Sequence, residues 1–376
     1  MALARSRKGI FFTLIAIMLM TILVIAFTPQ DNVSYKDRID TVNGRVDNSN
    51  EYVKRLKYVF VEQAVASSAR DATRALVLFE NKTTYLPNYD SVNTTLIELM
   101  MNGSINGTPV ECFVESLNPP PVSAADCQSR INSGYTIMKG KTFFTKLSAL
   151  TNVSKNTLNI NSRFSYSLKD YAVLFYQSNE TGPWQMGVNI SLNYSIDSGL
   201  SYWNVSQTVV VFYPVSGLLD PLYLVNATDA QSNEYVNRII RTNITVWNNT
   251  NLTQHVRDQK YAYNKDAPSL YMRLYGNLSN GGPGELSGSE CCGIESPVNP
   301  VRQALTTCHP KSYIDWCYYS SVCLPDRGVG KLWNITGVTT YAAGAEHYGF
   351  QLDTEHAVFY NVSNDVFGTL GVPVTC

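Results

Sequence analysis

Residues 188–196 read Val-Asn-Ile-Ser-Leu-Asn-Tyr-Ser-Ile, and this stretch decides the fold class of the chain. Its even positions are apolar and its odd positions carry Asn or Ser. Successive side chains of a strand point to opposite faces, so the pattern predicts a strand with one buried face and one wet face. Similar alternation recurs between turn signals on both sides. We therefore expect an antiparallel, sandwich-like β domain over residues 151–280, with further predicted strands at 240–247 and 270–278.

A helical pattern precedes this domain. Apolar residues recur at spacings of three, four and seven from Ile39 through Val42, Val46 and Val53. Proline is absent from residues 35–79, so nothing there forces a break. We expect a long amphipathic helix over residues 29–80. It could be an exposed stalk or a spine packed across the sheet, and the sequence leaves both open.

The N-terminus is strongly apolar after a short basic leader, residues 1–9. A run without charge, Pro or Gly begins at Ile10 and ends at Phe27. As a helix it would span roughly 27 Å, close to the thickness of a bilayer's hydrocarbon core. We expect a transmembrane helix over residues 10–28, held in the lipid bilayer of the cell membrane with a cytoplasmic N-terminus and the bulk of the chain extracellular. A cleaved signal peptide is the alternative, although no small-x-small cleavage site follows the run.

The chain has eight cysteines, all beyond this run. An even number in this position indicates disulfides formed in an oxidising compartment. Cys112 and Cys127 should close a polyproline loop within a loop-rich segment, residues 81–150. A bond between the adjacent Cys291 and Cys292 would be strained, so we expect each to pair elsewhere in a Cys-rich β region, residues 281–376. The partners available to them are Cys308, Cys317, Cys323 and Cys376.

Sequons of the form Asn-x-Ser/Thr are in excess, about 17 in all. Such sites carry glycans on the exposed surface of exported proteins. We predict covalently attached glycans, and the candidate asparagines are Asn81, Asn93, Asn152, Asn179, Asn189, Asn193, Asn204, Asn226, Asn243, Asn251, Asn277, Asn334 and Asn361.

Composition excludes several function classes. The net charge is −1 and charged residues make up 16% of the chain, so no basic face is expected for nucleic acid. His347 and His356 each follow a Glu, and a hairpin could bring them together around a metal, but surface pairs of this kind are common. No catalytic elbow, zinc helix or phosphate loop appears. We assign no catalytic residue, no metal and no cofactor, and we expect a protein that is not an enzyme.

The residues Arg7-Lys8-Gly9-Ile10-Phe11-Phe12 resemble a prepilin-type signal. In that family a peptidase cuts after the Gly, which implies processing between Gly9 and Ile10 here. Bacterial pilins have Glu five residues after the Gly, where this chain has Leu14; archaeal type IV pilin-like proteins, many of which lack that Glu, are more similar. The resemblance implies that residues 10–27 bind other pilin-like subunits in a surface filament.

The sequence thus predicts an α+β chain: an N-terminal transmembrane helix, a long amphipathic helix, and a disulfide-bonded, antiparallel β-rich ectodomain. The expected function is that of a membrane-anchored, N-glycosylated surface protein, a minor or tip component of a type IV pilus-like filament. The alternatives are a single-pass surface adhesin or receptor-like glycoprotein that does not polymerise and, in another class, a surface carbohydrate-active β-sandwich enzyme.

Overall fold

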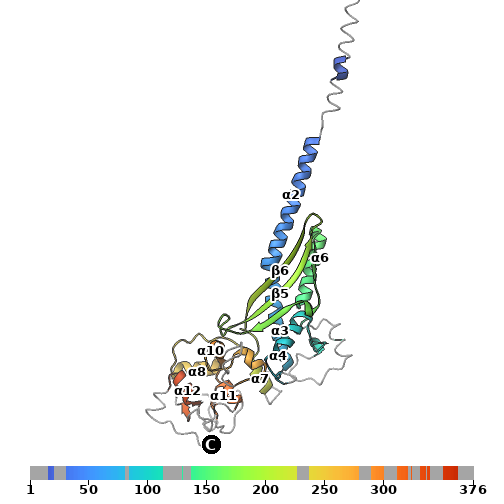
Figure 1. Ribbon diagram of the computed structural model, residues 1–376. Coiled ribbons are helices and arrows are strands. Elements are labelled where there is room, and N and C mark those ends of the chain that lie inside the picture. The colour runs from blue at the N-terminus through green and yellow to red at the C-terminus, as the bar shows by residue number, and fades with distance from the viewer. Residues whose placement is uncertain are drawn as a thin grey trace, which may run out of the picture.

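The computed structural model describes residues 16–20, 31–80, 84–112, 129, 137–226, 237–278, 289–299, 311–320, 323, 331–335, 337–338 and 350–362. In Figure 1 a long helix runs from one end of the molecule past an antiparallel sheet, and a group of short helices and strands lies at the sheet's other end. We call that group, from Leu218 onward, the head.

The long helix is continuous over residues 31–80. It comprises α2 (Asp31–Arg55), a single π-helical turn η1 (Leu56–Phe60) and α3 (Val61–Glu80). Val42 is 46% exposed, whereas Val61, Val65, Ala69 and Leu76 are fully buried. The first part of the helix therefore projects beyond the sheet and the last part packs on it (Figure 1). The two arrangements that the sequence left open are both present in one helix.

The main sheet is built around β5 (Gln185–Asp197), which pairs along its whole length with β6 (Tyr202–Pro214). Its other edge is shared by two short antiparallel strands, β3 (Asn161–Phe164) and β4 (Ala172–Tyr176), which pair with successive parts of β5. Val188, Ile190, Leu192, Tyr194 and Ile196 are all buried, as the alternation predicts.

Helices cover the buried face of this sheet. Helix α3 contacts β6, α4 (Tyr89–Asn102) contacts β4, and α6 (Phe143–Leu158) contacts β3. The side chain of Asn88 caps α4 by accepting a hydrogen bond from the Ser91 amide. At its other end Gly103 has a φ of 76°, and a Cβ there would lie 3.1 Å from Met138 and Thr142. Glycine is therefore required at this helix end.

Short elements connect and complete this part of the chain. They are the hairpin β1 (Ser104–Ile105) and β2 (Thr108–Pro109), and the single turns η2 (Val110–Cys112) and η3 (Leu168–Asp170).

Within the described residues the head consists of six short helices and four short strands. In order these are α7 (Pro221–Asn226), α8 (Asn249–Asp258), β7 (Ala262–Tyr263), α9 (Leu270–Leu274), α10 (Ser289–Cys292), β8 (Ile294–Glu295), α11 (Asp315–Tyr319), β9 (Leu332–Ile335), β10 (Phe350–Asp353) and α12 (Thr354–Phe359). A second hydrophobic cluster, which includes Leu252, Tyr313, Phe350 and Tyr360, forms the centre of the head. A larger hydrophobic cluster lies between the main sheet and its covering helices, and it includes Tyr223 of α7 and Leu270 of α9. These two helices therefore connect the head to the core beneath the sheet.

The predicted transmembrane helix is contradicted. Among the helices of the described residues, none is both long enough and apolar enough to cross a bilayer. Helix α2 has the length, 25 residues, but its sequence is rich in Asp, Asn, Lys and Arg. Of residues 10–28 the structure describes 16–20, a helical stretch of five residues.

The sandwich-like packing is also wrong, because helices rather than a second sheet cover the apolar face of the main sheet. Apart from that sheet, the described strands form three two-stranded antiparallel pairs. Residues 270–278 were predicted as a strand but begin with the helix α9, and residues 240–247 make only isolated backbone pairing, between Arg241 and Tyr261. Short apolar runs do not distinguish a buried strand from a buried helix, so packing decided both cases.

Candidate functional site

The cysteines pair differently from the prediction. Cys291 is bonded to its neighbour Cys292, with Cα atoms 3.7 Å apart, and Cys317 is bonded to Cys323. The expectation that Cys291 and Cys292 pair elsewhere is therefore wrong. It rested on the strain expected for a bond between adjacent residues, whereas the two cysteines lie together at the end of the short helix α10 (Ser289–Cys292). No cysteine whose side chain the structure describes is free. The side chain of Cys112 is not among those described, and Cys127, Cys308 and Cys376 lie outside the described residues, as do Gly9 and Ile10.

The predicted glycosylation sites fall into two groups. Six asparagines are exposed, namely Asn152, Asn179, Asn193, Asn204, Asn243 and Asn361. Six others are partly buried: Asn93, Asn189, Asn226, Asn251, Asn277 and Asn334. Asn81 lies outside the described residues. Glycosylation itself stays a prediction at every one of these positions.

Asn226 shows how packing can compete with modification. Its amide nitrogen donates hydrogen bonds to the Tyr85 hydroxyl and to the Leu222 carbonyl, both at 2.8 Å. A sugar would replace one of the two amide hydrogens, so one of these bonds would be lost in a glycosylated protein. Sequence reasoning could not separate this sequon from the exposed ones.

Two sequons lie side by side on the neighbouring strands β5 and β6. In the β5–β6 ladder Asn193 lies opposite Ser206 and Ser195 lies opposite Asn204. The sequons that start at Asn193 and Asn204 are therefore matched residue for residue on the solvent face. The period-two pattern predicted this face, but only the strand register brings the two sequons together.

The head encloses a buried ionic network around Arg273 of α9. Its Nη1 lies 2.6 Å from Asp220 Oδ2 and 2.8 Å from Asp315 Oδ2, and all three side chains have no exposed surface. Its Nη2 donates to the Ile294 carbonyl. Burial raises the pKa of Asp315 to about 6, although the Arg273 charge opposes this. The network ties α7, α9 and α11 together.

A second buried network surrounds Glu295 of β8. Its carboxylate accepts hydrogen bonds from Asn264 Nδ2 at 2.8 Å and from the Tyr360 hydroxyl at 2.8 Å, and it lies 3.1 Å from His356 Nε2. The other ring nitrogen of His356 lies 2.6 Å from Asp353 Oδ2. Burial alone would lower the pKa of His356, but the charges of Glu295 and Asp353 raise it well above its ordinary value.

These two buried networks stabilise the packing of the head. Each charged group has a buried, oppositely charged partner, as buried charges require. Cys317, Asp353 and His356 lie close enough together to suggest a metal site, but the sulfur of Cys317 is bonded to Cys323 and cannot serve as a thiolate ligand. His347, the other histidine of the predicted pair, lies outside the described residues.

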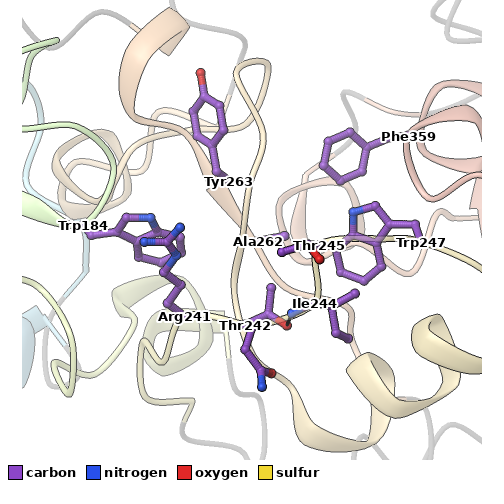
Figure 2. A pocket seen from close by; sticks show the side chains of 10 residues that line it. Trp184, Arg241, Thr242, Ile244, Thr245, Trp247, Ala262, Tyr263 and Phe359 are labelled. Carbon is purple, nitrogen blue, oxygen red and sulfur yellow. Dashed lines mark hydrogen bonds between the residues drawn. The ribbon is translucent and has the colours of Figure 1, made fainter.

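A groove with a volume of about 490 Å³ lies where the sheet meets the head. Figure 2 shows Trp184 and Arg241 at one end of it, Trp247 and Phe359 at the other, and Thr242, Ile244 and Thr245 between them. Asn243, Ala262 and Tyr263 complete the lining. Trp184 immediately precedes β5 and Phe359 ends α12. The lining residues from Arg241 to Trp247 come from the extended stretch before α8, and Ala262 and Tyr263 form β7.

The groove walls are fixed by specific contacts. The Thr242 amide donates to the Tyr261 carbonyl, and the Tyr261 amide donates to the Ile240 carbonyl, both at 2.8 Å. The Trp247 ring packs against His255, with centroids 5.0 Å apart, and against Tyr360, at 4.8 Å. At the opposite end the Arg241 guanidinium lies over the Trp184 ring, 5.4 Å from its centroid. The aromatic surfaces are therefore held in place before any ligand arrives.

The groove has the chemistry of a binding surface. Aromatic side chains supply apolar faces, and Thr242, Asn243 and Thr245 supply hydroxyl and amide groups. Binding pockets typically combine mostly apolar walls with a few polar groups in this way. None of the ten described residues that line the groove is acidic. The sequence pointed to Asn243 through its sequon but gave no sign of the groove, whose walls come from four separate segments.

No protein-family model matches this chain, and no curated protein or solved structure is detectably similar to it.

Proposed function

We propose that this protein is a pilin-like surface subunit, a minor or tip component of a type IV pilus-like filament. The observation that carries the proposal is the single helix of residues 31–80, which packs on a sheet at its C-terminal end and projects freely at its N-terminal end. In a pilin-like subunit, one helix serves as the spine of the outer domain and continues toward the neighbouring subunits. The processing motif Lys8-Gly9-Ile10 precedes this helix in the sequence.

Residues 10–27 are the proposed contact with other subunits. They contain no charged residue, so burying them among the equivalent residues of neighbouring subunits would remove a large apolar surface from water. Helix α2 then sets the distance between that contact and the folded part of the chain.

The head supports a minor or tip role. It lies at the end of the sheet opposite to the projecting helix (Figure 1). A subunit that brings its N-terminal residues to the filament would hold the head farthest from that contact. The described part of the head contains two disulfides, and these and the exposed sequons fit an oxidising, extracellular location.

The experiment that tests this proposal is N-terminal sequencing of protein taken from the native cell surface, with immunogold labelling of surface filaments. We expect Ile10 as the first residue and label along or at the ends of filaments. Gly9→Leu should block processing and abolish the filament label. Gly44→Ala is the matched control, because a Cβ on that helical glycine meets no atom within 4 Å.

Other outcomes would overturn the proposal. A retained N-terminus at Met1 would favour the surface glycoprotein that does not polymerise. A start near Gln30 would mean that residues 10–27 are removed before the protein reaches the surface.

A further inference from the structure

We propose that the groove between Trp184 and Trp247 holds the protein's own glycan, the first sugars of a chain linked to Asn243. This inference deepens the proposed function, because it rests on the prediction that the surface protein is N-glycosylated. It concerns one site and one occupant, and it does not depend on filament assembly.

The position of the sequon carries the inference. Arg241, Asn243 and Thr245 alternate with Thr242 and Ile244 along an extended stretch, and the first three are exposed while the other two are partly buried. Asn243 lines the groove and is accessible to modification. The pairing of Thr242 with Tyr261 anchors the backbone just before it. A sugar linked to Asn243 would therefore begin inside the groove.

The lining matches the surface of a sugar. A pyranose ring presents C–H groups on its faces and hydroxyls around its edge. The rings of Trp247, Phe359 and Tyr263 offer apolar faces, and Tyr263 is 45% exposed. The hydroxyls of Thr242 and Thr245 offer hydrogen bonds close to the first sugar. Among the described residues that line the groove, Arg241 is the one with a charge, and its guanidinium already lies on the Trp184 ring.

Other exposed sequons provide the contrast. Asn193 and Asn204 lie on the solvent face of β5 and β6, where their cross-strand neighbours are Ser206 and Ser195. Glycans there would extend from a flat sheet face, whereas a glycan at Asn243 has walls on both sides. It would contact Trp184 next to the sheet and Trp247 in the head, and so join the two.

The test uses glycoprotein purified from its native cells and mild sodium periodate, which cleaves vicinal diols on accessible sugars. Mass spectrometry follows the oxidation of each glycopeptide. We expect the Asn243 glycan to react at least tenfold more slowly in the native protein than in the denatured protein. The Asn193 glycan should react at similar rates in both.

Variants separate shielding in the groove from other causes. Trp184→Ala combined with Tyr263→Ala removes two walls of the groove, one partly buried against the core and one exposed, and should raise the native Asn243 rate several-fold. Tyr202→Ala is the matched control, because this aromatic residue is 61% exposed and lies on β6, outside the groove lining. Acrylamide quenching of tryptophan fluorescence gives a second readout that does not require a reactive diol. Asn243→Gln should increase quenching, and Asn193→Gln should not.

Three results would overturn the inference. The first is an unmodified Asn243 in a protein that carries a glycan at Asn193. The second is equal quenching in wild type and Asn243→Gln. The third is the absence of glycans at all sequons, which would also remove glycosylation from the proposed function. An Ile10 N-terminus and filament labelling would still stand in that case, so the two proposals fail separately.

Discussion

The hydroxyl of Thr73 on α3 lies 2.7 Å from the hydroxyl of Tyr213 on β6, and both groups are buried. The Thr73 hydroxyl also donates to the Ala69 carbonyl at 3.0 Å. This polar contact inside an apolar interface fixes how the packed half of the long helix sits on the sheet. It lies within the packed part of the helix, which is already buried at Leu56 and Val61.

Thr73→Val and Tyr213→Phe should each lower the free energy of unfolding by about 1–3 kcal/mol, because each leaves a buried hydroxyl or its acceptor without a partner. The double variant should lose less than the sum of the two losses. Urea denaturation of all four proteins measures this coupling. Ser67→Ala on the exposed side of the same helix is the control and should change little. Strict additivity of the two losses would show that the contact does not contribute.

Arg273→Met should destabilise the protein by about 3–5 kcal/mol, because Asp220 and Asp315 would be left as buried carboxylates without their cation. The loss is measured as a shift of the urea midpoint. Lys265→Met is the control, since its ion pair with Asp266 is on the surface. Equal midpoints for the two variants would mean that water or another group reaches the carboxylates.

Acid should weaken the protein partly through His255. Burial lowers the pKa of His255 to about 4, and neither ring nitrogen has a hydrogen-bond partner within the described residues. In the unfolded chain its pKa is about 6.5. At a pH between these two values, His255 is protonated in the unfolded chain and neutral in the folded protein. The free energy of unfolding therefore decreases as the pH falls from about 6.5 to about 4.

His255→Phe keeps the ring contact with Trp247 and removes the titration. We expect the variant to be as stable as wild type at pH 7 or slightly more stable, and to lose less stability between pH 6.5 and pH 4. Glu295 and Asp353 have lowered pKa values, so the stability that their ionised forms contribute is lost at lower pH than the contribution of His255. Denaturation at a series of pH values measures the difference, and identical slopes for the two proteins would contradict the prediction.

Peptide mapping without reduction should find a loop closed by Cys317 and Cys323. It should also find one peptide in which Cys291 and Cys292 are both oxidised without a second chain attached. Replacing Cys317 and Cys323 together with Ala should cost about 2 kcal/mol, since the loop that they close is short. A peptide that links Cys291 to Cys308 or Cys376 would instead restore the pairing that the sequence suggested.

Local pattern carried much of the fold in this chain. Strand periodicity placed the buried residues of β5, since Ile190 and Leu192 have to face the same side of a pleated strand. The absence of Pro and the recurring apolar residues placed the helix of residues 29–80 to within about two residues of α2 and α3. Both signals depend on neighbours along the chain, so no knowledge of the tertiary fold is needed to read them.

Local pattern failed where an element is short and its environment decides its form. Residues 270–274 are apolar enough for a strand. They form a helical turn instead, and this turn places the Arg273 guanidinium in contact with the carboxylates of Asp220 and Asp315. The bond between Cys291 and Cys292 likewise depends on a turn of α10 that no spacing rule predicts.

The sequence by itself determined that one helix would precede an antiparallel sheet, and that many sequons and an even number of cysteines would accompany them. Only the tertiary structure decided which segments pack against, pair with or lie beside one another. It placed helices where a second sheet was expected, set Asn193 against Ser206, and gathered Trp184, Asn243 and Trp247 around one groove. The physical reason is that periodicity reports which face of an element is buried, whereas the identity of the covering surface depends on contacts between residues far apart in the chain.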